Sequence, residues 1–133
     1  MLKYTIPGRP ISKKNSMQMA YNKATGKMFP VQSEAYKRFE KEARKALLPI
    51  PEKPVAEKVN VRCLYFMPTR SKVDLCNLLG GTCDVLVKHG VIADDNSNIV
   101  VGHDGSRVLY DKENPRTEIY IEEIADADNE KGS

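Results

Sequence analysis

Apolar and polar residues alternate with a period of two in three segments of the chain, and this pattern predicts β-strands. The three segments are residues 2–6, 59–66 and 117–124. The middle segment carries apolar residues on both faces, which favours a central strand. Two shorter apolar segments, residues 98–101 and 106–110, predict further strands.

A period of about 3.6 residues predicts two amphipathic helices. The first spans residues 33–48, with Ser33 as its N-cap. The second spans residues 74–89 and stops at Gly90, a residue suited to the left-handed turn that ends a helix. Its apolar stripe consists of Leu75, Leu78, Leu79, Thr82, Cys83 and Leu86. Its polar face consists of Asp74, Asn77, Gly81, Asp84 and Lys88.

The region between the first strand and the first helix predicts a β-hairpin whose turn lies near Thr25 and Gly26. Strands and helices are then mixed along one short chain. This order predicts an α+β fold in which two main helices pack on a mixed sheet. We expect one compact domain at residues 1–124 and an acidic, disordered tail at residues 125–133.

The composition, 41% hydrophobic and 29% charged, is ordinary for a globular protein in the cytoplasm. No apolar run approaches the roughly 18 residues of a membrane span, so we expect no membrane partner. Three cysteines lack both an even count and metal-binding spacing, which predicts free, reduced thiols.

Charge is distributed unevenly: residues 121–133 hold five acids and one lysine, so the body of the chain is more basic than the net charge of +3 indicates. A basic body is compatible with a nucleic-acid partner. Lys13, Lys14 and Asn15 carry the flexible cations and small amide that suit phosphate contacts. Loop lysines more often contact only water, so charge alone does not assign this function.

Acidic residues lie at both ends of the second predicted helix. Asp74 stands at its start, and Asp94 and Asp95 follow its end. Carboxylates are the ligands that hard divalent cations prefer, so the pattern suggests metal chemistry. The alternatives are that Asp74 is only a helix cap and that the acidic pair forms a turn.

The motif D-L-x-N-L beginning at Asp74, followed by G-V-I-x-D-D ending at Asp95, resembles the RusA family of Holliday-junction resolvases. The resemblance implies a homodimer that binds branched, four-way DNA and cuts it with Mg²⁺, in phage or prophage recombination and repair. It implies that Asp74 and Asp95 are catalytic. It implies a metal site formed by Asp74, Asp95 and Asp94. It implies nucleic-acid contacts from Lys13, Lys14, Asn15, Arg70, Lys72 and Asn77.

Two positions depart from the family motif: Cys76 stands where the family has a second aspartate, and Gly80 where it has a catalytic lysine. A thiol is a poor ligand for Mg²⁺, and glycine cannot stabilise negative charge. Mn²⁺ is therefore a possible substitute cofactor. Three interpretations remain open: a weakened junction endonuclease, a junction-binding dimer without metal chemistry, and a small soluble domain with no nucleic-acid role.

Helix geometry limits which acids can meet. Asp84 lies ten residues after Asp74, about 15 Å along a helix, which is too far for ligands of one metal centre. The return from Gly90 to Asp95 spans at most about 17 Å, whereas the helix is about 24 Å long. A meeting of Asp74 with Asp95 therefore requires a late helix start, a tilted return or a partner subunit.

Overall fold

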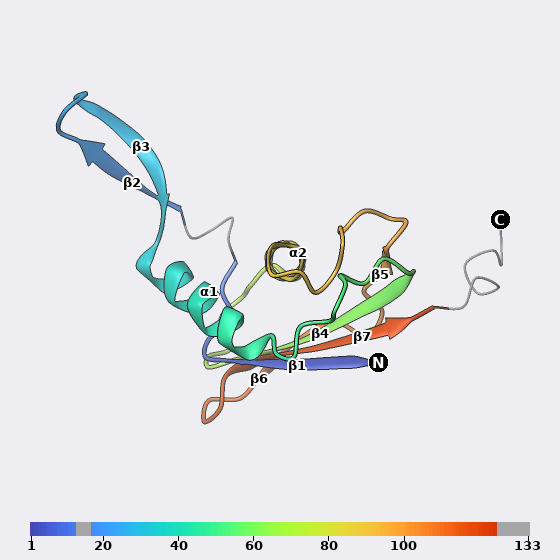
Figure 1. The fold of residues 1–133 in the computed structure, drawn as a ribbon. Coiled ribbons are helices and arrows are strands. Elements are labelled where there is room, and N and C mark those ends of the chain that lie inside the picture. Colours follow the sequence, from blue (N-terminus) through green and yellow to red (C-terminus); the bar gives the residue numbers. More distant parts are fainter. Residues whose placement is uncertain (13–16, 125–133) are drawn as a thin grey trace.

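The computed structural model describes residues 1–12 and 17–124, and its elements follow the order that the sequence predicts (Figure 1). The strands are β1 (Leu2–Pro7), β2 (Met17–Asn22), β3 (Lys27–Gln32), β4 (Val59–Met67), β5 (Val100–Gly102), β6 (Arg107–Tyr110) and β7 (Arg116–Glu123). The helices are α1 (Glu34–Ala46) and α2 (Leu75–Lys88). The α+β class and the single compact domain are confirmed. The predicted tail, residues 125–133, lies outside the described residues.

The main sheet is mixed, as predicted, and β4 is its central strand. The strand order is β1-β7-β4, with antiparallel pairing throughout this part. On its other side β4 pairs in parallel with β5 near its start and with β6 near its end. The central position that the sequence predicts for β4 is confirmed, because β4 has neighbouring strands along both of its edges.

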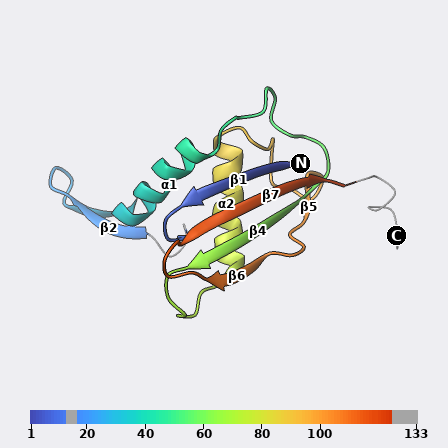
Figure 2. The same cartoon turned by 90° about the horizontal axis from the view of Figure 1, so that it is seen from below.

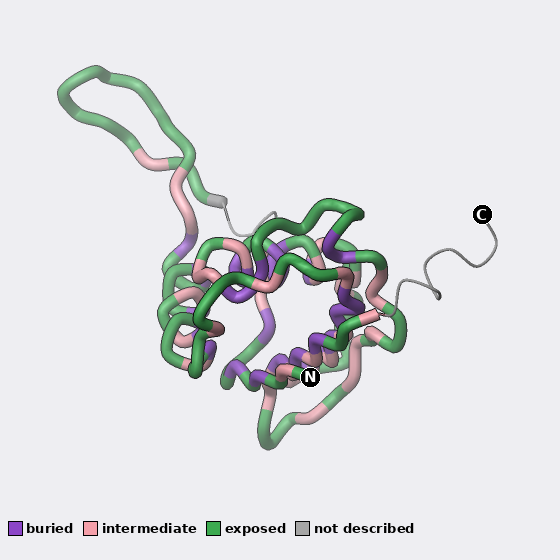
Figure 3. The backbone as a smooth tube through the Cα atoms, turned by 45° about the vertical axis from the view of Figure 1, so that its right-hand side comes forward, coloured by how far each residue is buried: buried purple, intermediate pink, exposed green. Residues whose placement is uncertain are grey.

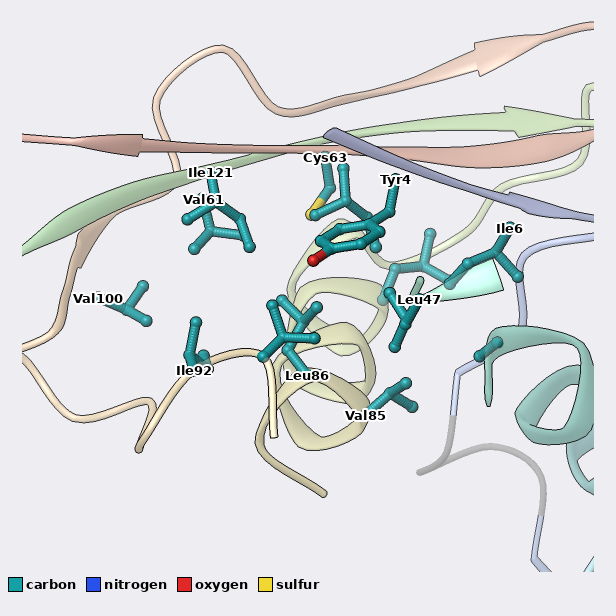
Figure 4. Packing of buried hydrophobic residues seen from close by; sticks show 14 of the residues in the cluster. Tyr4, Ile6, Leu47, Val61, Cys63, Val85, Leu86, Ile92, Val100 and Ile121 are labelled. Carbon is teal, nitrogen blue, oxygen red and sulfur yellow. The ribbon is translucent and has the colours of Figure 1, made fainter. Parts of the chain in front are cut away.

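Both helices lie on one face of this sheet (Figures 1 and 2). Every second residue of β4 points toward them, so Val61, Cys63 and Tyr65 are buried, whereas Arg62, Leu64 and Phe66 are only partly covered. Figure 4 shows Leu86 and Val85 of α2 in the same core. This packing fixes α2 across the sheet and thereby fixes the positions of its two ends.

The observed helix α2 matches the predicted one closely. Asp74 is its N-cap, His89 its C-cap, and Gly90 has a φ of 80°, the left-handed value expected at a helix stop. One prediction is wrong: Gly81, placed on the polar face, is buried. The buried face of α2 therefore extends beyond the predicted apolar stripe to Gly81 and Val85.

The strand predicted at residues 98–101 begins later, at Val100. The backbone carbonyl of Asn96 accepts hydrogen bonds from the amides of Ile99 and Val100 at 3.0 and 2.9 Å, and the side chain of Asn96 accepts another from the Asn98 amide at 2.9 Å. These bonds form a tight turn, so the first two residues of the apolar segment belong to the turn.

The predicted hairpin exists as β2 and β3, with Gly26 at a φ of 70° in its turn. It projects away from the sheet and helices (Figures 1 and 3). Every residue from 21 to 30 is exposed. The three cysteines are free, with Cys63 and Cys83 buried and Cys76 exposed, as the composition predicts. In the described part of the chain, neither helix is long and apolar enough to cross a membrane.

Candidate active site

The N-terminal end of α2 presents Asp74 at the surface. Its Oδ1 atom accepts hydrogen bonds from the backbone amides of Cys76 and Asn77, at 2.9 and 3.3 Å. Asp74 therefore caps the helix, and both bonds use the same oxygen. Asp74 also lines a pocket of about 260 Å³ together with Arg9 and Lys72. The pocket thus combines one carboxylate with two cationic side chains, an arrangement suited to a phosphate beside a bound cation.

The two positions that depart from the family motif are both open to solvent. Cys76 is exposed in the first turn of α2, and a side chain added at Gly80 would meet no atom within 4 Å of its Cβ. An aspartate at position 76 and a lysine at position 80 would therefore both fit the fold. The fold thus has space for these two side chains at positions where this chain has a thiol and no side chain.

Asp94 and Asp95, which follow α2, have different surroundings. The Oδ1 atom of Asp94 accepts a hydrogen bond from the Asp95 amide at 2.7 Å, and its Oδ2 atom accepts one from the Asn96 side chain at 3.1 Å. These bonds lower the pKa of Asp94, the Asp95 amide being the largest cause. Both oxygens of Asp94 thus accept hydrogen bonds within the loop.

Asp95 lies in a second pocket, of about 320 Å³, beside the C-terminal half of α2. Asp84 and Glu40 line the same pocket, and Lys88 pairs with Glu40 across the gap between α2 and α1. Tyr36 shares this pocket, and its pKa is raised to about 12 by burial first and then by the charges of Glu40 and Asp84. The pocket is therefore rich in carboxylates from three parts of the chain.

Asp84 was not assigned to this pocket from the sequence. It was considered only as a second metal ligand beside Asp74 and was excluded by the distance along the helix. Asp84 and Asp95 line the same pocket, and both carboxylates act on the Cys83 thiol. Its pKa is raised to about 12 by burial, then by Cys63, and then by the charges of Asp95 and Asp84. Spacing along α2 alone does not reveal this neighbourhood, because Asp95 arrives from the loop.

Asp74 and Asp95 line different pockets. Helix α2 begins immediately after Asp74, so a late start does not shorten the gap. The returning loop brings Asp95 to the level of Asp84, which lies about 15 Å from Asp74 along the helix. Among residues 1–12 and 17–124, no group of three His, Cys, Asp or Glu residues is arranged to hold a metal ion. A single chain therefore does not bring Asp74 and Asp95 together as ligands of one divalent metal.

The predicted DNA-binding residues are divided. Lys13, Lys14 and Asn15 lie outside the described residues, and Lys72 lines the Asp74 pocket. The remaining two are Asn77, which is half-buried, and Arg70, whose guanidinium lies 4.1 Å from the centre of the Tyr110 ring. Arg9 was not singled out from the sequence, although it begins the same basic segment as the two lysines.

Comparison with known families gives one match. The family model described as endodeoxyribonuclease RusA matches residues 7–122. The match runs from the end of β1 almost to the end of β7 and includes both pockets. No curated protein matches the chain.

Proposed function

The chain belongs to the RusA family of endodeoxyribonucleases, and we propose that it is a structure-selective endonuclease that cuts four-way DNA junctions by metal-dependent phosphodiester hydrolysis. The family membership supports a Holliday junction endonuclease. The observation that carries the proposal is that the match covers nearly the whole described fold, with Asp74 exposed beside Arg9 and Lys72.

We propose Mg²⁺ as the cofactor, with Asp74 and Asp95 as its main ligands and Asp94 as a further candidate. Because one subunit keeps Asp74 and Asp95 in separate pockets, the proposal requires a homodimer. A two-fold axis perpendicular to α2 sets two copies of this helix antiparallel. Asp74 of one subunit then faces Asp95 of the other, and each dimer has two equivalent sites.

A bound divalent cation would supply charge neutralisation at the scissile phosphate. The protein's own contribution is to hold the DNA backbone in place. Lys72 and Arg9 lie beside Asp74 and are the cations placed to bind phosphate oxygens. Arg70 and Asn77, together with Lys13, Lys14 and Asn15, are proposed to extend this contact along the junction arms.

The second candidate function is a junction-binding dimer that has lost its chemistry. The specific observation in its favour is the thiol at Cys76 together with the absence of a side chain at Gly80. Sulfur is a soft ligand that suits Mg²⁺ poorly, and Mn²⁺ accepts irregular ligand sets more readily. The response to the two metals therefore separates these two functions.

The test uses a synthetic four-way junction and a linear duplex of the same sequence. We expect steeply salt-dependent junction binding, slow cutting with Mn²⁺ and weaker cutting with Mg²⁺. Asp74→Asn is the matched control, because asparagine also caps a helix well. It should fold and bind while losing the cutting activity.

Intact junction binding without cleavage under either metal would favour the binding-only dimer. Absence of junction binding would overturn both functions. We place the activity in the cytoplasm of a bacterial cell or phage-infected host, since the family's substrate, recombining DNA, is found there.

A further inference from the structure

The projecting hairpin carries an exposed apolar face that the proposed function does not use. In the antiparallel register Tyr21 lies opposite Met28, and Met19 opposite Pro30. Residues opposite each other or two apart share one face of a strand pair. Met19, Tyr21 and Met28 therefore form one surface, and they are 59%, 59% and 56% exposed.

The charge of the hairpin has one sign. Lys23 and Lys27 flank its turn, and residues 17–32 contain no aspartate or glutamate. Within α1, by contrast, lysines and arginines alternate with glutamates that neutralise them, as in the Lys37–Glu34 pair. An apolar face framed only by cations is complementary to a polyanion that also exposes apolar surface.

The hairpin also lacks support from the rest of the described subunit, since residues 21–30 are all exposed. An isolated two-stranded hairpin is marginally stable in water, and exposed apolar clusters of this kind usually mark a binding site. A partner that covers Tyr21 and Met28 would both stabilise the hairpin and bury its exposed apolar surface.

We propose that the Met19, Tyr21 and Met28 face of the hairpin docks at the branch point of a DNA junction, where the side chains stack on exposed base-pair faces. Lys23 and Lys27 contact the phosphates on either side. The inference rests on the proposed function and names the element that distinguishes a branched substrate from a linear one.

The branch point is favoured over a second protein copy by charge and by size. Hairpin-to-hairpin contact would bring four lysines together without a balancing acid. Three side chains also bury much less than the roughly 1,600 Å² of a standard protein interface. A linear duplex hides its base faces by stacking, whereas a branch point exposes them to aromatic and apolar side chains.

The experiment compares the double variant Tyr21→Ser, Met28→Ser with the control Ile50→Ser. Ile50 is 45% exposed and lies outside the hairpin, so the control also removes one exposed apolar side chain. Affinity for a four-way junction and for a linear duplex is measured for each protein. A second readout is the fluorescence of 2-aminopurine placed at the crossover, which rises when its base is unstacked.

We expect the hairpin variant to lose about tenfold or more of its junction-over-duplex preference. Its duplex affinity should stay unchanged, and the fluorescence rise should disappear. The Ile50→Ser protein should behave as the wild type. Circular dichroism checks that both variants are folded.

A variant that keeps the preference and the fluorescence rise would overturn this inference and leave the endonuclease proposal standing. A variant that changes from dimer to monomer in light scattering would also overturn it, because the hairpin would then bind a second copy. A wild-type protein that binds no junction would overturn the proposed function and this inference together.

Discussion

The two ends of α2 differ in how they hold their carboxylates. At the start, Asp74 is fixed by backbone amides and lies among cations. At the other end, Asp84 and Asp95 share a pocket with Glu40, whose charge is paired with Lys88. One end thus has a single fixed carboxylate beside two cationic residues, and the other has several acids.

Under the proposed function, each end of α2 carries only part of the metal site. The helix acts as a rigid spacer, and the core side chains of Leu86 and Val85 hold it on the sheet. Movement within one subunit therefore does not close a gap of about 15 Å. Two antiparallel copies of the helix would bring the complementary ends together.

The largest effect should come from restoring the family residues at the N-terminal end. The double substitution Cys76→Asp, Gly80→Lys adds an oxygen ligand and a cation at positions with free space. We expect junction cutting with Mg²⁺ to rise about 100-fold or more, with little change in junction affinity. Gel assays of cleavage and of binding measure the two quantities separately.

Gly80→Lys alone is the matched control for added positive charge. It should strengthen DNA binding slightly without a comparable gain in cutting. If the double variant cuts no faster than the wild type, the N-terminal end of α2 is not part of the active centre.

A second experiment tests whether the two ends meet across a dimer. In the restored background, Asp74→Asn and Asp95→Asn proteins are prepared separately, mixed and allowed to exchange subunits. A site shared between subunits regenerates one intact centre in each mixed dimer, so about a quarter of the active centres should return. The measurement is nicking of the junction before and after mixing.

Recovery on mixing contradicts a site contained in one subunit, because every subunit then carries one defect. Two inactive proteins that stay inactive after demonstrated exchange would instead place the centre within single subunits. The active centre would then have to use residues other than the pair Asp74 and Asp95, which lie at opposite ends of α2.

The sequence predicted most of the fold because its patterns are local. Ser33, Asp74 and Gly90 sit at helix ends for reasons of backbone hydrogen bonding, and the structure places them there. The distances between residues that lie far apart in the sequence were harder to predict. Asp84 joins Asp95 only because the loop after α2 returns beside α1, and no periodicity encodes that path.

A smaller effect is expected on stability from the glycines of α2. Gly80→Ala should raise the free energy of unfolding by about 1 kcal/mol, because alanine is a better helix former and its Cβ meets no neighbour. Gly90→Ala also meets no neighbour but has a φ of 80°, so it should lower stability by about 1 kcal/mol. Urea denaturation measures both changes. If both substitutions changed the free energy of unfolding by the same amount in the same direction, the positive φ of Gly90 would not matter for stability.

The smallest effect concerns pH and the C-terminal end of α2. The pKa of His89 lies below its ordinary value of 6.5, chiefly through burial and then through the charge of Lys88. The fold therefore favours neutral His89. Its stabilising contribution is complete above pH 6.5 and is lost as the pH falls through the lowered pKa, because the unfolded chain takes up a proton more readily. His89→Gln does not titrate here, so its Tm should fall less than that of the wild type between pH 7 and pH 5. Identical slopes in the two proteins would show that protonation of His89 does not destabilise this end of the helix.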